Sequence, residues 1–508
     1  MYNARRSFLQ TVAVGSLAGV FNSDLSFLSK LNSVSAAEAK LDSGKVHLRP
    51  EIDPLVRLLE ETSRDKVLEK VAERIRSGVS YREVLAALLL AGVRNVQPRP
   101  AVGFKFHAVL VVNSAHLASL SSPDSDRWLP IFWAIDEFKA SQARDVEEGN
   151  WTMSAVDDSA LPPAHQARDA FVTAMEKWDE SAVDVAAASL ARHAGANEIF
   201  ELFARFAPRD FRSIGHKAIY VANAWRTLQC IGWQHSEPVL RSLAYAMLNH
   251  EGEGSPANAD LDADRPMKRN QELAKTVRAD WQTGRVDSGA TRELLATLRA
   301  NSERDACEAT VKMLNAGVAP ESIYDAFLVG SGELLMRKPG IVGLHAVTST
   351  NALRYIFSAS ANDETRKLVL LQNAAFLPLF RGAMESRGSI ASTRVDDLQP
   401  AEKTETGEQA IAEIFRDVSG KPAQASSKLL AFLRDKGSPE DFITAARRLV
   451  FLKGNDSHDY KFSSAVLEDY YHTSPEWRDT FLATSVYRLN GAGEPDNKLV
   501  QRIRSAFA

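Results

Sequence analysis

A histidine-bearing stretch occurs twice in this sequence of 508 residues. One copy begins His107-Ala108-Val109 and the other begins His345-Ala346-Val347, and an asparagine follows each histidine after six residues, at Asn113 and Asn351. Both copies are preceded by the same order of short features: a glycine-containing turn, an apolar run, and a basic residue before a proline. An internal repeat constrains the fold strongly, because each copy must form the same local unit.

Two shorter copies of this pattern place a histidine at the equivalent point. His216 lies between the long copies, and His458 follows the second of them. The interval from His107 to His345 nearly equals the interval from His216 to His458. The sequence therefore predicts an internal duplication, with four histidine-bearing repeats in two pseudo-symmetric halves.

The spacing of apolar residues predicts helices in both halves. Val67, Val71 and Ile75 recur at four-residue steps, which places one apolar stripe along a helix. Alternating strand patterns bounded by hairpin turns do not occur. We therefore predict an all-α protein, a helical repeat or bundle. The first helical half is expected at residues 50–250, an acidic linker at 251–272, and the second helical half at 273–508.

The composition is that of an ordinary globular protein, with 45% hydrophobic and 25% charged residues. The formal net charge of −4 gives no electrostatic reason to expect a nucleic-acid partner, and no basic stripe or nucleic-acid-binding motif occurs. No apolar run is long enough for a stable membrane span. A small-molecule ligand is the partner that we expect, whereas the sequence gives no indication of the oligomeric state.

The first residues resemble an export signal. Arg5-Arg6 begins a twin-arginine pattern, an apolar run extends from Thr11 to Phe21, and Val34-Ser35-Ala36 offers a cleavage site. A membrane anchor is the alternative, but the run is much shorter than the ~20 residues that a spanning helix needs. We therefore predict a twin-arginine signal peptide at residues 1–36, and a periplasmic or extracellular protein.

The two cysteines, Cys230 and Cys307, do not form a metal-binding pattern. The oxidising environment of an exported protein would permit one disulfide between them, and two unpaired thiols are equally consistent with the sequence. Because no cysteine-based zinc or haem motif occurs, a metal in this protein must be held by histidine and carboxylate side chains.

The four repeat histidines form the candidate metal site, His107, His216, His345 and His458. A single histidine at a helix start is more often a capping or core residue. Four at matched positions indicate a shared site, because equivalent positions of pseudo-symmetric repeats converge on a common axis. Imidazole suits iron and copper, our preferred metals, and also zinc. In an extended solenoid, by contrast, neighbouring histidines would lie ~10 Å apart, too far for one ion.

A second group of residues is expected to orient ligand or substrate. Three asparagines follow their histidines by about two helical turns, and buried asparagines require hydrogen-bond partners. His116 and Arg354 occupy equivalent places on the opposite helix face, where they could meet an anion. A further matched pair of histidines precedes helices, where capping is the alternative role. The group comprises Asn113, His116, Asn223, Asn351, Arg354, His235 and His472.

Three segments, Phe104 to Leu120, Gly215 to Asn223 and Gly343 to Ile356, resemble the questin oxidase-like family in their histidine-bearing helices. Ala115-His116-Leu117 and the run from His345 to Leu353 carry this likeness. The resemblance implies a helical, oxygenase-like scaffold with histidines at its centre. The family's namesake opens an anthraquinone ring with a nicotinamide reductant, yet this sequence contains no flavin- or nicotinamide-binding motif.

Two functions are compatible with these patterns. One is an exported metal-dependent oxidoreductase, oxygenase-like, that acts through a histidine-coordinated transition metal on a small organic molecule, with aromatic compounds among the candidate substrates. The alternative is a non-enzymatic α-helical repeat scaffold that binds a ligand or a protein in the cell envelope, because helical repeats commonly serve as binding scaffolds.

Overall fold

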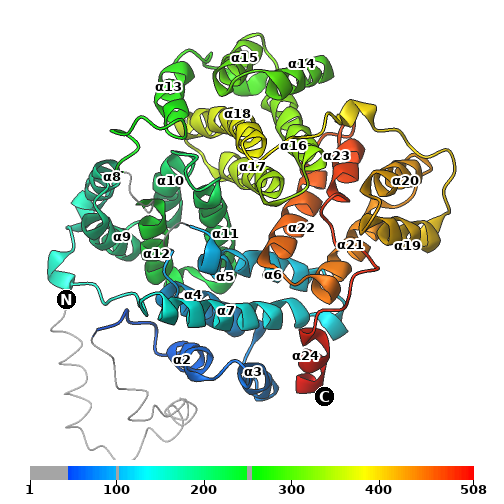
Figure 1. Ribbon diagram of the computed structural model, residues 1–508. Helices are drawn as coiled ribbons and strands as arrows, with labels where there is room; N and C mark the ends of the chain where they lie inside the picture. Colours follow the sequence, from blue (N-terminus) through cyan, green and yellow to red (C-terminus); the bar gives the residue numbers. More distant parts are fainter. Residues whose placement is uncertain (1–43, 99–101, 249–253) are drawn as a thin grey trace, which may run out of the picture. The chain divides into compact units, whose positions relative to one another are not determined.

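A computed structural model describes residues 44–98, 102–248 and 254–508 of the protein (Figure 1). This part of the chain contains many helices and no β-strand. Its only extended pairings are two isolated bridges, Lys45 with Ser154 and Arg285 with Val318. The all-α fold is therefore confirmed. The predicted signal peptide, residues 1–36, lies outside the described residues.

The helices of the first predicted half carry two of the repeat histidines, His107 on α5 and His216 on α11. Their bounds are α2 (Asp53–Glu61), α3 (Val67–Arg76), α4 (Tyr81–Asn95), α5 (His107–Leu110), α6 (Val112–Leu120), α7 (Leu129–Glu147), α8 (Ala167–Lys177), α9 (Glu180–His193), α10 (Ala196–Phe206), α11 (His216–Ile231) and α12 (Ser236–Leu248). Short 3-10 helices include η2 (Phe104–Phe106) before α5 and η6 (Trp233–His235) after α11.

The helices of the second predicted half follow a similar order. Their bounds are α13 (Arg265–Ala274), α14 (Ser288–Ala300), α15 (Glu303–Asn315), α16 (Pro320–Arg337), α17 (Ile341–Ala359), α18 (Asp363–Glu385), α19 (Gly407–Val418), α20 (Pro422–Arg434), α21 (Pro439–Lys453), α22 (Ser457–Asp469), α23 (Arg478–Ser485) and α24 (Leu499–Phe507). The 3-10 helix η9 (Tyr470–His472) follows α22, as η6 follows α11.

Local sequence explains where α4 begins. The Ser80 hydroxyl accepts a hydrogen bond from the Glu83 backbone N–H, and the Glu83 carboxylate accepts one from the Ser80 N–H at 2.8 Å. This reciprocal capping satisfies two backbone donors that the first turn would leave free. The apolar residues that follow are buried along nearly the whole helix.

The predicted linker at 251–272 differs in the structure, because α13 begins inside it at Arg265. Pro266 lies in the first turn of α13, where its missing N–H has no helical partner to lose. Met267 and Asn270 are buried on one face of this helix. The acidic composition of the segment therefore concealed an amphipathic helix that packs against α15 and α18.

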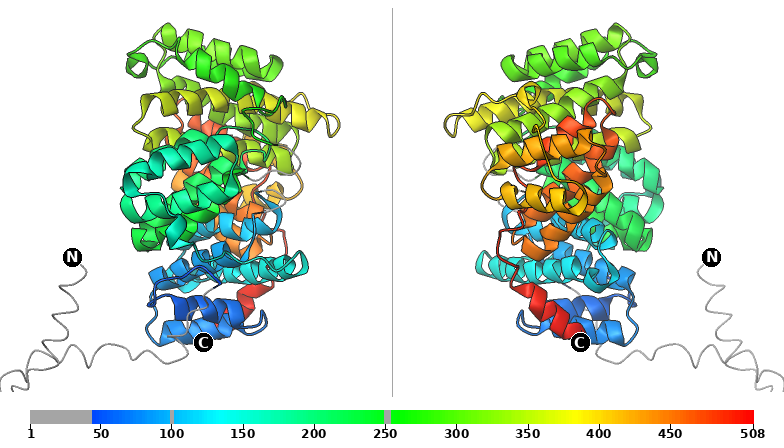
Figure 2. Two further views of the ribbon diagram at one scale, coloured as in Figure 1. Left: turned by 90° about the vertical axis from the view of Figure 1, so that its left-hand side faces the viewer. Right: turned by 90° about the vertical axis from the view of Figure 1, so that its right-hand side faces the viewer.

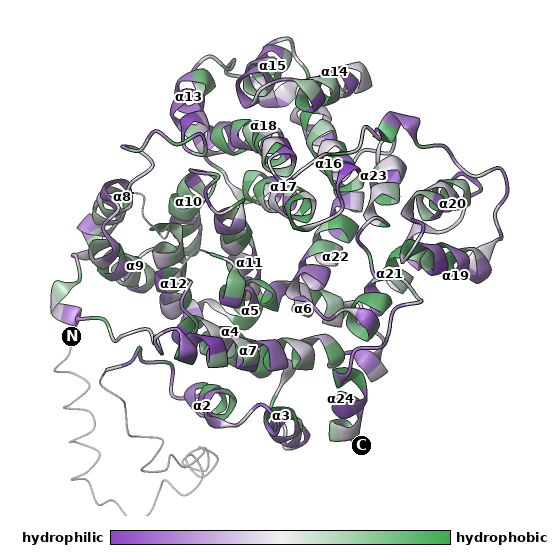
Figure 3. Cartoon of the chain, viewed as in Figure 1, coloured by the Kyte–Doolittle hydropathy of each residue, from purple (hydrophilic) through white to green (hydrophobic). Residues whose placement is uncertain are grey.

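The four histidine-bearing segments pack against one another. α11 contacts α5, α6 and α17, and α22 contacts α6 and α17 (Figure 1). Residues 342–353 of α17 are all buried, and Figure 3 shows this helix mainly in apolar colours, whereas α13 and α19 carry many hydrophilic residues. The histidines are therefore carried by helices that form part of the hydrophobic core.

The two predicted halves belong to one compact unit, Gly44–Ala508. The C-terminal helix α24 packs against α3 and α7 of the first half, and Figure 2 shows it beside these helices. The two halves have the same order of helices along the sequence, with α2 to α12 in the first half and α14 to α23 in the second, if α5 and α6 together are compared with α17. That these halves superpose as a duplication stays a prediction.

No helix among the described residues is long and apolar enough to cross a membrane. Cys307 is buried and unpaired, and its thiol donates to the Leu371 carbonyl at 3.3 Å. Cys230 is half-buried and also unpaired. The disulfide that the sequence left open is therefore not formed in this structure.

Candidate metal centre

The structure brings the four repeat histidines together. His107 and His216 are the first residues of α5 and α11, His458 is the second residue of α22, and His345 is the fifth residue of α17. The Nε2 atom of His216 lies 3.1 Å from that of His107 and 2.9 Å from that of His345. The ring of His458 lies 4.4 Å from that of His107, between centroids.

Three of the four side chains have ligand atoms close enough together to bind one metal ion. One ligand atom from each of His107, His345 and His458 lies within 4.8 Å of the other two. These histidines could hold a metal ion, and the short Nε2 distances place His216 beside them as a fourth donor.

The other nitrogen of each ring, Nδ1, has an acceptor as its partner. A carbonyl or carboxylate oxygen only accepts, so each neutral ring carries its hydrogen on Nδ1 and a lone pair on Nε2. Histidines that bind metals through Nε2 are oriented in this manner. The partners are Phe104 O for His107 at 2.8 Å, Ser213 O for His216 at 2.8 Å, Ile341 O for His345 at 2.6 Å and Asp456 Oδ1 for His458 at 2.6 Å.

Burial disfavours the positively charged, doubly protonated form of these imidazoles. Desolvation lowers the pKa of His107, His216 and His345 well below the usual value, and nearby positive groups lower it further. Desolvation also lowers the pKa of His458, against the opposing effect of its hydrogen bond to Asp456. The neutral rings of His107, His216 and His345 therefore direct their Nε2 lone pairs at one another, an arrangement that a bound cation would relieve.

The His458 nitrogen provides an independent test of fit. Its Nε2 is buried and has no hydrogen-bond partner among the described residues. A buried polar atom without a partner is costly and rare in folded proteins. A metal ion bound by the neighbouring nitrogens would give this atom a partner, so the donor set fits a metal ion.

Close packing around Gly215 positions His216. Gly215 precedes α11 with φ +82°, a conformation that favours glycine. A Cβ atom at this position would clash with the side chain of Ser349 on α17. The Ser349 hydroxyl donates to the Ile214 carbonyl at 3.3 Å, which also ties the start of α11 to α17.

The histidines open onto a cavity of about 550 Å³. Phe104, Ile214 and Ile341 form apolar parts of its wall, and the side chains of Phe104 and Ile341 are 64% and 47% exposed. Glu137 and Arg144 provide charged groups at the same cavity. Burial raises the pKa of the Glu137 carboxyl, and the charge of Asp456 adds to this effect. A small molecule can therefore approach the histidine nitrogens from this side.

Lys461 is a residue of this site that the sequence analysis missed. It lies one helical turn after His458 on α22, and its side chain is buried with no hydrogen-bond partner for Nζ among the described residues. Burial lowers the pKa of Lys461 to about 7. Its charge is one of the causes that lower the pKa of all four histidines.

The predicted asparagines lie away from the histidine cavity. The Asn113 amide donates to Asn223 Oδ1 at 3.5 Å, and the Asn223 amide donates to the Leu110 carbonyl at 3.1 Å, which links α5, α6 and α11. The Asn351 amide donates to Glu468 and Asp469, each at 3.0 Å, which links α17 to α22. These side chains connect the histidine-bearing helices instead of lining the cavity.

The other predicted residues are also absent from the lining of this cavity. His116 Nδ1 lies 2.9 Å from the Tyr81 hydroxyl, and the Arg354 guanidinium lies 5.7 Å from the centre of the Tyr324 ring. His235 and His472 line two other cavities, one beside η6 and one beside η9. The structure therefore does not bring these four residues to the histidine cluster.

Comparison with known proteins gave no match to a family model, a curated protein or a solved structure. The resemblance to the questin oxidase-like family therefore stays a prediction from short motifs.

Proposed function

We propose that the protein is a metal-dependent oxidoreductase whose four repeat histidines coordinate one transition-metal ion and whose substrate is a small organic molecule. The observation that carries this proposal is the cluster of four imidazoles, each with an acceptor at Nδ1, in which ligand atoms of His107, His345 and His458 lie within 4.8 Å of one another. The oxygenase-like character and the aromatic substrate class rest on the motif resemblance alone.

The donor set favours iron or copper over zinc. The cluster offers imidazole nitrogens and no thiolate, and imidazole suits iron and copper, whereas structural zinc sites usually include thiolates.

The protein would hold such an ion with its histidines and would bind the substrate beside it in the cavity. A redox metal, when bound, supplies electron transfer and Lewis acidity. Four neutral imidazoles leave the charge of the ion uncompensated, so an anionic substrate group gains from approaching it. Asp456 is the nearest fixed carboxylate, and the hydrogen bond from His458 lowers its pKa so that it stays ionised. Phe104 and Ile341 provide apolar surface for the rest of the substrate.

Metal analysis is the direct test of the proposal. Protein purified without a histidine tag is expected to contain about one equivalent of iron or copper, because buried neutral imidazoles are clustered at metal-ligand spacing and imidazole suits these ions. Inductively coupled plasma mass spectrometry on the full chain measures this content. Protein that is isolated without metal, and whose melting temperature is the same with and without added iron or copper, would instead support the scaffold alternative.

Substrate-dependent oxygen uptake separates an oxidoreductase from a protein that only stores metal. Metal-loaded protein and chelator-treated protein would each be assayed with a panel of small phenols and quinones, and an oxygen electrode would measure oxygen uptake. Uptake that requires both the metal and one member of the panel supports the enzymatic role.

Export is a separate part of the proposal and rests on the sequence of residues 1–36. The mature protein is expected to begin near Ala37, because the small-residue site Val34-Ser35-Ala36 precedes it. N-terminal sequencing of protein from the native host checks this expectation. Soluble protein that retains Met1 would exclude the signal peptide.

A further inference from the structure

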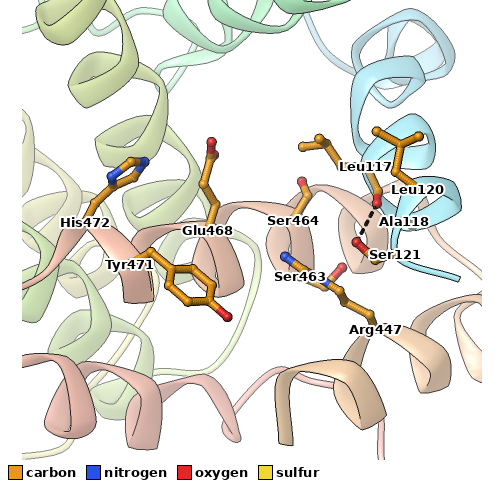
Figure 4. A pocket seen from close by; sticks show the side chains of 10 residues that line it. All are labelled: Leu117, Ala118, Leu120, Ser121, Arg447, Ser463, Ser464, Glu468, Tyr471 and His472. Carbon is orange, nitrogen blue, oxygen red and sulfur yellow. Dashed lines mark hydrogen bonds between the residues drawn. The ribbon is translucent and has the colours of Figure 1, made fainter. Parts of the chain in front are cut away.

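A second cavity lies at the other end of α22 from the histidine cluster. Its volume is about 350 Å³, within the range of small-ligand sites. Figure 4 shows residues from α6, α21, α22 and η9 around it. Its lining comprises Leu117, Ala118, Leu120, Ser121, Arg447, Ser463, Ser464, Glu468, Tyr471 and His472.

Arg447 brings a positive charge to this cavity without an anionic partner. Its side chain makes neither an ion pair nor a hydrogen bond within the part of the chain that the structure describes. Partial burial lowers the pKa of Arg447, and Tyr471 and Glu468 oppose this effect. The adjacent Arg448 differs, because it is exposed and lies 3.9 Å from the Asp126 carboxylate. A half-buried guanidinium without a carboxylate partner is a typical recognition group for anions.

The acidic residues near this cavity are already compensated. Glu468 forms an ion pair with Arg226 at 3.0 Å and accepts a hydrogen bond from Asn351 at 3.0 Å. Burial raises the pKa of Asp469 to about 8, so this side chain is mostly neutral at pH 7. The ionised groups close to the cavity therefore include one satisfied carboxylate and the unsatisfied charge of Arg447.

The rim of the same cavity is apolar. Leu120 and Tyr471 are 55% and 54% exposed, and they are among the few large hydrophobic side chains that the described part of the chain presents to solvent. Leu117 and Ala118 extend this surface inward from α6. Figure 4 shows Leu117 and Leu120 on one side of the cavity, with Arg447 and Tyr471 on the other. The cavity thus combines an apolar wall with a single cation.

We propose that this cavity binds a small organic carboxylate, whose acid group pairs with the Arg447 guanidinium and whose apolar body lies against Leu117 and Leu120. The Ser464 hydroxyl also lines this cavity, although it is hydrogen-bonded to the Ser114 hydroxyl at 2.9 Å, so Arg447 is the group that would pair with the acid. The site is separate from the proposed metal centre and does not depend on it, because none of its lining residues belongs to the histidine cavity.

Isothermal titration calorimetry with octanoate tests this site, with octan-1-ol as the neutral analogue. Octanoate is expected to bind the full-length protein in the millimolar range or tighter, and octan-1-ol at least tenfold more weakly. Arg447→Gln is expected to weaken octanoate binding at least tenfold, since a hydrogen-bonded ion pair is lost. Arg448→Gln is the matched control and should leave binding unchanged.

Two further variants keep the test independent of folding and of the metal. Leu120→Ser changes an exposed residue and should weaken octanoate binding by shrinking the apolar wall, while the melting temperature stays unchanged. His345→Ala disturbs the histidine cluster and should leave octanoate binding unchanged. No binding of octanoate by the wild-type chain, equal binding of octan-1-ol, or a loss below tenfold in Arg447→Gln would overturn the proposal.

Discussion

His345→Ala is expected to lose its bound metal while the protein keeps its fold. The substitution removes the imidazole whose Nε2 lies 2.9 Å from that of His216. Changes to groups that only support a metal ligand cost about 10–100-fold in affinity, so the loss of a ligand itself should cost at least as much. Metal content after dialysis against a weak chelator, measured beside the melting temperature, reports both effects.

The fold should tolerate this change better than the metal does. In the metal-free protein the imidazole of His345 faces other lone pairs, so its removal relieves an unfavourable contact. The cavity left behind has the opposite effect, and a typical buried substitution costs about 0.5–3 kcal/mol. A fall in metal content that exceeds any effect on the metal-free protein's stability is therefore the expected pattern.

His193→Ala is the matched control for this experiment. His193 also carries a ring whose Nδ1 bonds a backbone carbonyl, that of Ser189 at 2.9 Å, but it is exposed at the end of α9. The His193→Ala variant should keep both the bound metal and the melting temperature of the wild-type protein. Equal behaviour of the two variants, or full metal content in His345→Ala, would show that the repeat histidines are helix-start residues without a ligand role.

The helices and the convergence of the histidines could be predicted because both depend on periodicity. An apolar stripe every three to four residues specifies a helix face, and a repeated histidine specifies equivalent places on repeated units. Sequence spacing contains no information on the helix crossings that set the nitrogen distances. For this reason the sequence alone is also compatible with the extended ladder of a solenoid, which the packing of α11 against α17 excludes for these histidines.

The residues that the sequence predicted to orient a ligand do not line the histidine cavity, because the rise along each helix separates them from the histidines. Asn113 and Asn351 follow their histidines by six residues, which is a rise of about 9 Å on a helix. His235 follows the C-terminal end of α11, whereas His216 stands at its start, about 24 Å away along a helix of 16 residues. Matched sequence positions at opposite helix ends therefore cannot share one site.

Lys461 could have been found from the sequence. Residues three apart on a helix are neighbours on one face, so a lysine three residues after His458 is placed near the imidazole. The burial of that lysine could not be predicted in the same way, because it depends on the helices that pack around α22. Lysines are almost never fully buried without a partner, which made an exposed position the default expectation.

Lys461→Met is expected to stabilise the metal-free protein by up to about 5 kcal/mol below neutral pH, at 1.36 kcal/mol for each pKa unit. The pKa of Lys461 is lowered from 10.5 to about 7 in the folded state, because burial disfavours the charged amine. Between these values the unfolded chain binds one more proton than the folded protein, so wild-type stability rises with pH across this window. Methionine removes the penalty at a similar volume, so its advantage is largest below pH 7 and declines toward pH 10.5.

Urea denaturation of chelator-treated protein at pH 6.5 and pH 9.5 measures this difference directly. Subtracting wild type from variant at each pH cancels the titration of groups that both chains share. Lys312→Met is the matched control, because Lys312 is an exposed lysine on α15 that keeps its hydration when the chain folds. It should change the free energy of unfolding by less than about 0.5 kcal/mol at either pH. A Lys461→Met variant that is no more stable than wild type at pH 6.5, or whose advantage is the same at pH 9.5, would mean that Nζ reaches water or an anionic partner and keeps its charge beside the histidines.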